Sequence, residues 1–260
     1  MANIYFDLTR EFNARGTIAI LASGQAVVYY RLAMMSKDGD WIVKETGDAC
    51  GTILAVLDRH QARYRPGAPL DPRWLSGGWS SHFEFFDDRR RRIRCDFFSR
   101  PPKVAAAARD DLFATASEDP LAVIGIEDLI LMKRTQSAKD YAVIGELARR
   151  LPPAREIEFT TDVDRLCELA PGFTTGSQRP TARVALEGPR DSVVVALARE
   201  TDQLQQADHQ RLRRYEAAAR EYLAAFRKAD IQDGPLAAAH ETACRLAEEC
   251  LPRDPLGLQG

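Results

Sequence analysis

Residues 17–43 read TIAILASGQAVVYYRLAMMSKDGDWIV, and their order decides the expected fold. The short apolar run at 17–22 is rich in β-branched and aliphatic residues and predicts a buried strand. A Ser-Gly pair follows, and the apolar stretch 25–35 then predicts a buried helix. Residues 41–44 predict a second strand, which is entered through an Asp-x-Asp pair. This alternation predicts an α/β domain.

The segments around this stretch predict further strands and many helices. Residues 82–86 and 93–98 predict a β-hairpin with a charged tip, and 121–124 predicts a short strand. Apolar residues recur at helical spacing in several other segments, namely 6–15, 51–60, 125–136, 138–151, 163–169, 193–229 and 237–251. The Pro- and Gly-rich stretch 64–81 is expected to be a long loop that exposes Trp74 and Trp79, and 174–189 is also expected to be a loop.

Pro152-Pro153 is the clearest boundary in the chain. We therefore predict a strand-containing domain at residues 1–151 and a mostly helical region at 152–260. The expected fold is a small mixed sheet flanked by helices, followed by this helical part.

Composition limits the classes of function. The formal net charge of −2 argues against a protein that coats nucleic acid by bulk charge. The chain has no run of about 18 apolar residues, and its beginning does not resemble a secretory signal, so neither a membrane partner nor secretion is expected. Its five cysteines show no metal-binding spacing and favour reduced thiols in a cytoplasmic protein.

Three aspartates could carry chemistry. Asp38 and Asp40 are two residues apart at the entry to a strand, so their side chains are expected on one face. Asp96 lies in the middle of the later hairpin, where an unpaired carboxylate among apolar neighbours would be costly. If the two strands are neighbours, the three carboxylates converge, and oxygen donors of this kind suit Mg²⁺. Two such ions can stabilise an in-line nucleotidyl transfer.

Ser23 and Gly24 stand where a buried strand turns into a helix. Glycine allows a ligand to approach the backbone closely, and the free N–H groups of a helix start favour an anion. The pair therefore predicts a phosphate-binding turn, although an ordinary strand-to-helix turn would read the same. The Asp-x-Asp pair alone would also fit a solvated turn.

Several stretches together resemble the nucleotidyltransferase superfamily. They are ASGQAV at 22–27 and SKDGDWIV at 36–43, followed by IEDLILMKR at 126–134 and AKDY at 138–141. The last two are similar to segments of the branch that holds the AbiEii-type abortive-infection toxins and related bacterial proteins. The resemblance extends over residues 5–151 and does not include the C-terminal part.

This resemblance implies a nucleotidyltransferase fold that uses Mg²⁺ and a nucleoside triphosphate, with RNA, a protein or a small molecule as the hydroxyl acceptor. It leaves open whether the protein has an antitoxin as its partner. Asp38, Asp40 and Asp96 would bind metal, and Asp96 would also help to activate the acceptor. Ser23 and Gly24 would hold the triphosphate, with Lys133 neutralising its charge and Asp140 orienting Lys133 or a nearby base.

The chain departs from this pattern beside the Asp-x-Asp pair. Residues 31–36 read RLAMMS, where the superfamily usually has an arginine close to the aspartates, and Gly39 replaces a residue that is usually apolar. These departures leave a second hypothesis open: a nucleotidyltransferase-like protein without turnover, which binds a nucleotide or acts on a protein partner through its helical part.

Overall fold

The computed structural model describes residues 3–105, 108–116, 121–172, 179–229, 231 and 234–257. The chain forms two compact units, of which the first joins Met1–Ile124 to Arg213–Gly260 and the second is Gly125–Leu212. The domain boundary expected at residues 151 and 152 stays a prediction. In the described ranges, no helix combines the length and the apolar character needed to cross a membrane.

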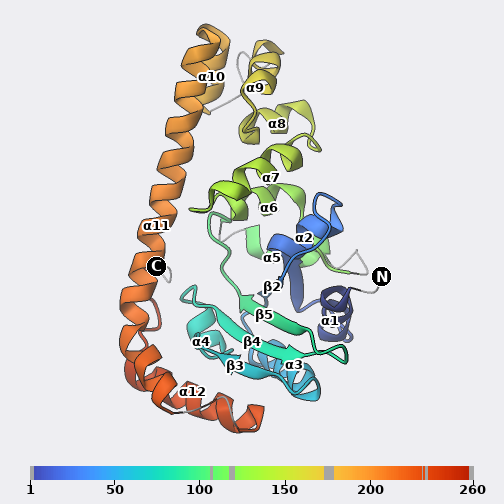
Figure 1. Ribbon diagram of the computed structural model, residues 1–260, viewed down its shortest axis with the longest axis vertical. Helices are drawn as coiled ribbons and strands as arrows, with labels where there is room; N and C mark the ends of the chain where they lie inside the picture. Colours follow the sequence, from blue (N-terminus) through green and yellow to red (C-terminus); the bar gives the residue numbers. More distant parts are fainter. Residues whose placement is uncertain are drawn as a thin grey trace. The chain divides into compact units, whose positions relative to one another are not determined.

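The first unit contains a five-stranded mixed sheet (Figure 1). Its spatial order is β1-β2-β5-β4-β3, and only β2 and β5 pair in parallel. The strands are β1 (Ala19–Ala22), β2 (Asp38–Val43), β3 (Arg63–Arg65), β4 (Ser81–Phe86) and β5 (Arg92–Phe98). The predicted mixed α/β sheet and the β4–β5 hairpin are therefore confirmed.

The helices of the first unit come from both ends of the chain. Figure 1 shows α12 beside β3 and α3. In addition, α1 packs against β1. Asn3, Thr46 and Asp71 cap three helix starts by accepting backbone N–H groups. The helices are α1 (Ile4–Phe12), α2 (Ser23–Tyr29), α3 (Gly47–Arg59), α4 (Pro72–Leu75), α5 (Ala108–Ala116), α12 (Leu236–Cys250) and the second half of α11 (Arg190–Lys228).

A row of aromatic rings crosses the buried face of the sheet. Trp41 on β2 stacks on Phe97 of β5, with ring centroids 5.3 Å apart. Phe83 on β4 follows at 5.7 Å from Phe97, and Tyr64 on β3 lies 4.3 Å from Phe83. All four side chains are fully buried or nearly so. Burying these rings supplies much of the hydrophobic stabilisation of the unit and fixes which face carries polar residues.

The expectation that Trp74 and Trp79 are exposed is wrong. Their exposed fractions are 0% and 6%. Both indole N–H groups donate to the C-terminal segment: Trp74 to the Leu251 carbonyl at 3.3 Å and Trp79 to the Pro252 carbonyl at 2.8 Å. The stretch 64–81 looked like a loop because of its prolines and glycines, but it contains α4 and packs against residues far along the chain.

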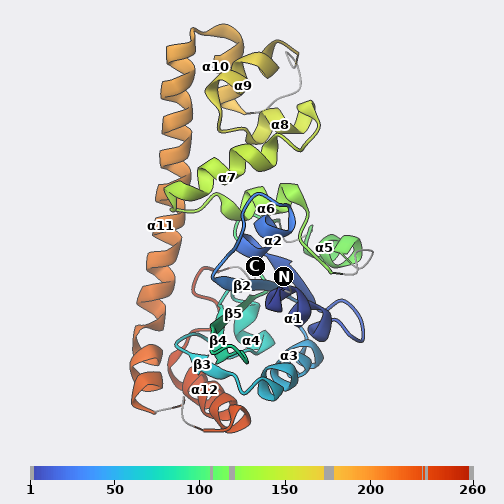
Figure 2. The same cartoon turned by 45° about the vertical axis from the view of Figure 1, so that its right-hand side comes forward.

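Every regular element among the described residues of the second unit is a helix (Figure 2). Ile157, Leu166 and Val193 belong to a hydrophobic cluster that holds α8, α9, α10 and α11 together. Its elements are α6 (Ile126–Lys133), α7 (Ala138–Ala148), α8 (Pro153–Phe159), α9 (Val163–Leu169), the 3₁₀ turn η1 (Ala170–Gly172), α10 (Pro180–Glu187) and the first half of α11. The mostly helical character expected of the later part of the chain is confirmed.

Two local expectations are corrected. Residues 121–124 form no regular strand, because only the single bridge between Leu21 and Val123 pairs them with β1. The expected loop at 174–189 contains α10, whose first residue is a proline, a residue that is favoured in the first turn of a helix. Residues 173–178 of that expected loop lie outside the described ranges.

His240 joins α12 to the sheet and predicts a dependence of stability on pH. Its Nδ1 lies 2.7 Å from the Tyr64 hydroxyl, which accepts the Leu70 N–H. Burial lowers the pKa of His240 below its ordinary value of 6.5, Arg73 lowers it further, and Asp71 opposes both effects. The unfolded chain therefore takes up a proton at a higher pH than the folded one, so stability is full above pH 6.5 and falls on acidification below it.

Urea unfolding measured between pH 7.5 and pH 5 should show this loss in the wild-type chain. In the His240→Gln variant, the part of the pH dependence of the unfolding free energy that comes from His240 should vanish. An unchanged pH dependence of the unfolding free energy in the variant would show that His240 does not cause the loss of stability in acid.

Candidate functional site

The three predicted carboxylates share one face of two neighbouring strands. Asp40 on β2 is the register partner of Asp96 on β5. Asp38 lies two residues before Asp40 on the same strand, and both are half-buried, whereas the intervening Gly39 is buried. The sequence therefore placed these residues correctly on a common face, opposite the row of aromatic rings.

Basic side chains surround the carboxylates on this face. Arg94 Nη1 lies 3.5 Å from Asp38 Oδ1. Arg65 Nη1 donates to Asp96 Oδ1 at 3.2 Å. His82 Nδ1 lies 2.8 Å from the same oxygen, but without the alignment of a hydrogen bond. The negative charge of Asp38 and Asp96 is thus balanced within the protein.

The predicted three-carboxylate metal centre is not present in this arrangement. Among the described residues, no group of three or more His, Cys, Asp and Glu side chains is placed to hold a metal ion. The reason is that Asp38 faces Arg94, while Asp96 faces Arg65 and His82. The donor chemistry suits Mg²⁺, but the side-chain positions do not form its coordination shell.

The packing around Gly39 explains why this position, between the two aspartates, has no side chain. A Cβ atom here would lie 2.4 Å from Trp41 Cη2 and 2.5 Å from Tyr5 Cδ1. The two aromatic rings fill the space that an apolar side chain would otherwise take. Glycine at position 39 therefore follows from the packing of the aromatic face, which is opposite to the face that carries Asp38 and Asp40.

Ser23 and Gly24 form the tight turn from β1 into α2, as predicted. Ser23 has a positive φ of 49°, which is uncommon for a residue other than glycine. A Cβ atom on Gly24 would lie 2.2 Å from Ser36 Oγ. Close packing against the segment before β2 therefore requires glycine here. The role of this turn in holding a triphosphate stays a prediction.

Lys133 and Asp140 pair with each other in the second unit. Lys133 Nζ lies 3.0 Å from Asp140 Oδ1, and the lysine side chain is buried. Thr135 Oγ1 donates to the other carboxylate oxygen at 3.1 Å. The pairing that the resemblance implied between these residues is present. Their contribution to nucleotide binding stays a prediction, because the three aspartates belong to the first unit.

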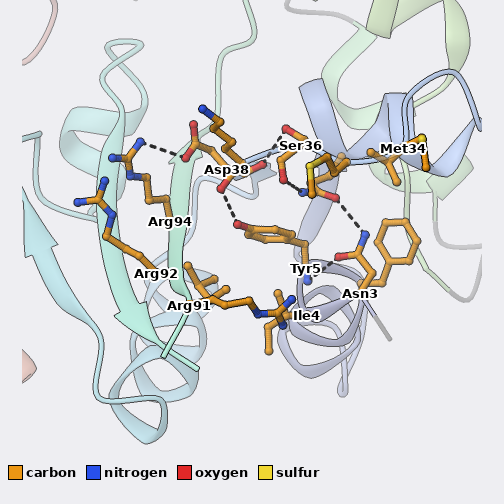
Figure 3. Close-up of a pocket in the computed structure, with 15 residues that line it drawn as sticks. Asn3, Ile4, Tyr5, Met34, Ser36, Asp38, Arg91, Arg92 and Arg94 are labelled. Atoms are coloured by element: carbon orange, nitrogen blue, oxygen red, sulfur yellow. Dashed lines mark hydrogen bonds and ion pairs between the residues drawn. The ribbon is translucent and has the colours of Figure 1, made fainter. Parts of the chain in front are cut away.

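A pocket of about 630 Å³ lies at the start of β2 (Figure 3). Asp38 and Ser36 line it together with the start of α1 and the first residues of β5. Burial raises the pKa of Tyr5 to about 12, so its phenol stays protonated and donates to the Lys37 carbonyl at 2.7 Å. The remaining lining residues are Asn3, Ile4, Phe6, Gln25, Val28, Met34, Met35, Arg91, Arg92, Ile93 and Arg94.

Sequence reasoning missed the basic residues that face the carboxylates. Arg65, His82 and Arg94 alternate with buried residues along their strands, as polar residues on a half-exposed face should. That alternation was visible in the sequence. The pairing that places His82 beside Asp96 and Arg65 beside His82 depends on strand order and register, which the sequence alone did not supply.

Comparisons with known proteins give distant structural matches. No protein-family model matches the chain, and no curated protein matches its sequence. A "putative nucleotidyltransferase from H. pylori" is similar in structure at a TM-score of 0.38 and 11% identity, over 80% of this chain and 96% of that one. JHP933 from Helicobacter pylori is similar at 0.39 and 11%, over 82% and 94%. Likenesses this distant assign neither a family nor an activity to the chain.

Proposed function

We propose that this chain is a nucleotidyltransferase that moves a nucleoside monophosphate from a nucleoside triphosphate to a hydroxyl group on RNA, a protein or a small molecule. The observation that supports the proposal is the register of Asp40 with Asp96 on parallel neighbouring strands, with Asp38 on the same face. This face offers acidic and basic side chains together, which is what phosphate chemistry at a hydroxyl needs.

In the proposed transfer, the acceptor oxygen forms a bond to the α-phosphorus, the bond between the α-phosphorus and the bridging oxygen breaks, and pyrophosphate leaves. The hydroxyl proton passes to a carboxylate, for which Asp96 is our candidate. Arg65 and Arg94 bring positive charge to the same face and would stabilise the phosphate oxygens. Mg²⁺ could join this site only after Asp38 and Asp96 gave up their present partners.

The test is nucleotide incorporation. Purified protein with labelled nucleoside triphosphates and cellular RNA, with and without Mg²⁺, should transfer label to an acceptor. The Asp38→Ala, Asp40→Ala double variant should lose the activity by at least about a hundredfold, as expected when charged groups that act on the transition state are removed. A matched control is the Asp48→Ala, Asp58→Ala variant, which removes two exposed carboxylates from α3. Equal incorporation by the two double variants would refute the proposal.

A second candidate is a nucleotide- or protein-binding protein without turnover, such as a degenerate relative of the toxins. It is favoured by the ion pairs that occupy Asp38 and Asp96. Calorimetry with nucleoside triphosphates separates the possibilities. Binding without incorporation supports a nucleotide-binding module. Absence of both at millimolar nucleotide would support action on a protein partner, such as an antitoxin.

A further inference from the structure

The pocket at the start of β2 has an apolar wall that is open to solvent. Ile4 and Phe6 of α1 and Val28 of α2 contribute to it. Met34 and Met35 complete the wall, and their exposed fractions are 99% and 80%. Two neighbouring methionines so fully in water are unusual, because apolar side chains of this size normally bury most of their surface. An exposed apolar surface beside a pocket commonly marks a place where something binds.

The opposite wall is cationic. Lys37, Arg91, Arg92 and Arg94 line the pocket with Asp38 as the single acidic residue. Arg92 and Arg94 are two residues apart on β5 and project to the same side of the strand (Figure 3). Because β2 begins at the partner of Arg94, Arg92 extends past the end of β2.

The positive charge of this wall is only partly balanced by the protein. Arg91 forms a short ion pair with Asp87, at 2.6 Å. Arg94 lies 3.5 Å from Asp38 and Arg92 lies 3.9 Å from Glu84, both longer than a charge-assisted hydrogen bond. In addition, the buried Nε of Arg94 has no hydrogen-bond partner among the described residues. Buried donors are normally satisfied, so the guanidinium group of Arg94 retains hydrogen-bonding capacity that its present partners do not use.

We propose that this pocket binds a small phosphorylated molecule with an apolar or aromatic body. The phosphate would accept hydrogen bonds from Arg92 and Arg94, whose planar guanidinium groups suit a phosphate with several oxygens. The body of the ligand would cover Met34 and Met35. A volume of about 630 Å³ is in the range of small-molecule sites. Asp38 and Arg94 also belong to the site of the proposed function, so this proposal rests on the same face of the protein, but binding of the ligand does not itself require nucleotidyl transfer.

Calorimetric titration of the full-length protein with phenyl phosphate, inorganic phosphate and benzoate tests both walls. Phenyl phosphate should bind best: inorganic phosphate lacks the apolar body, and benzoate lacks the phosphate. The Arg92→Gln, Arg94→Gln variant should weaken phenyl phosphate by about tenfold or more, as removal of charged hydrogen bonds does. Met34→Gln, Met35→Gln should weaken phenyl phosphate but leave inorganic phosphate unchanged.

Arg59→Gln is the matched control, because it removes an exposed arginine on α3 that does not line the pocket. Thermal melting of each variant verifies folding, and Arg92→Gln alone affects an exposed side chain and serves if the double variant melts early. Binding that is unaffected by the arginine substitutions, or no saturable binding of phenyl phosphate at millimolar concentration, would overturn the proposal. Saturable binding of phenyl phosphate without any nucleotide incorporation would support this proposal and count only against the proposed function.

Discussion

Replacement of Trp41 by alanine should lower the free energy of unfolding by about 3–5 kcal/mol, the range measured for truncating large buried aromatic residues. The ring is fully buried, stacks on Phe97 and meets Phe12 edge-on at 5.3 Å. Its Nε1–H also donates to the buried Thr9 hydroxyl at 2.9 Å. The substitution leaves a cavity and also removes the donor to that hydroxyl, which keeps only the Tyr5 carbonyl as its acceptor.

Urea unfolding followed by circular dichroism measures this loss. Trp41→Phe is the matched control, because it retains most of the ring and loses mainly the hydrogen bond to Thr9. It should therefore cost clearly less than Trp41→Ala. If the two variants were equally stable, the aromatic row across the sheet would not be what stabilises the first unit.

Substitution of Gly39 by alanine should cost about 1–3 kcal/mol, which is typical of overpacking a closed core. The added Cβ would lie 2.4 Å from the Trp41 ring and 2.5 Å from the Tyr5 ring. Neither ring can easily move aside: Trp41 is stacked, and the Tyr5 hydroxyl is bound to the Lys37 carbonyl. The strand that carries Asp38 and Asp40 must therefore shift.

Gly51 provides the comparison, because it lies in α3 with nothing within 4 Å of an added Cβ. Gly51→Ala should stabilise the protein by about 0.5–1 kcal/mol, since alanine is the better helix former. The two Gly→Ala changes are thus expected to have opposite signs in the same unfolding experiment. A Gly39→Ala variant as stable as the wild type would mean that the crowding at Gly39 is relieved without cost.

The elements with strong periodicity were the ones that the sequence predicted best. Residues 163–169 and 193–229 alternate apolar and polar positions at helical spacing, and both are helices. Residues 121–124 are apolar, but their conformation depends on pairing with β1, which local pattern does not encode. Trp74 and Trp79 were misplaced for the same reason, because the segment that buries them is about 175 residues further along the chain.

Only the part of the candidate site that follows from the alternation of side chains along a strand was predictable from the sequence. The spacing of Asp38 and Asp40 on a strand was enough to place them on one face. Asp96 lies beside them only because β2 and β5 are neighbours in the sheet. The sequence alone did not show that these two strands are neighbours. The guanidinium groups that meet these carboxylates come from β3 and β5, and their positions follow from the register of the whole sheet.

The first unit is assembled from the two ends of the chain, and this affects how the protein is made. Tyr64, Trp74 and Trp79 obtain their partners from His240, Leu251 and Pro252, which leave the ribosome long after the strands of the sheet. The sheet can pair during synthesis, but this edge of it keeps its aromatic groups uncovered until residues 240–252 have been made. A chain that stops before residue 240 would therefore be prone to chaperone capture and degradation, even though every residue of the sheet is present.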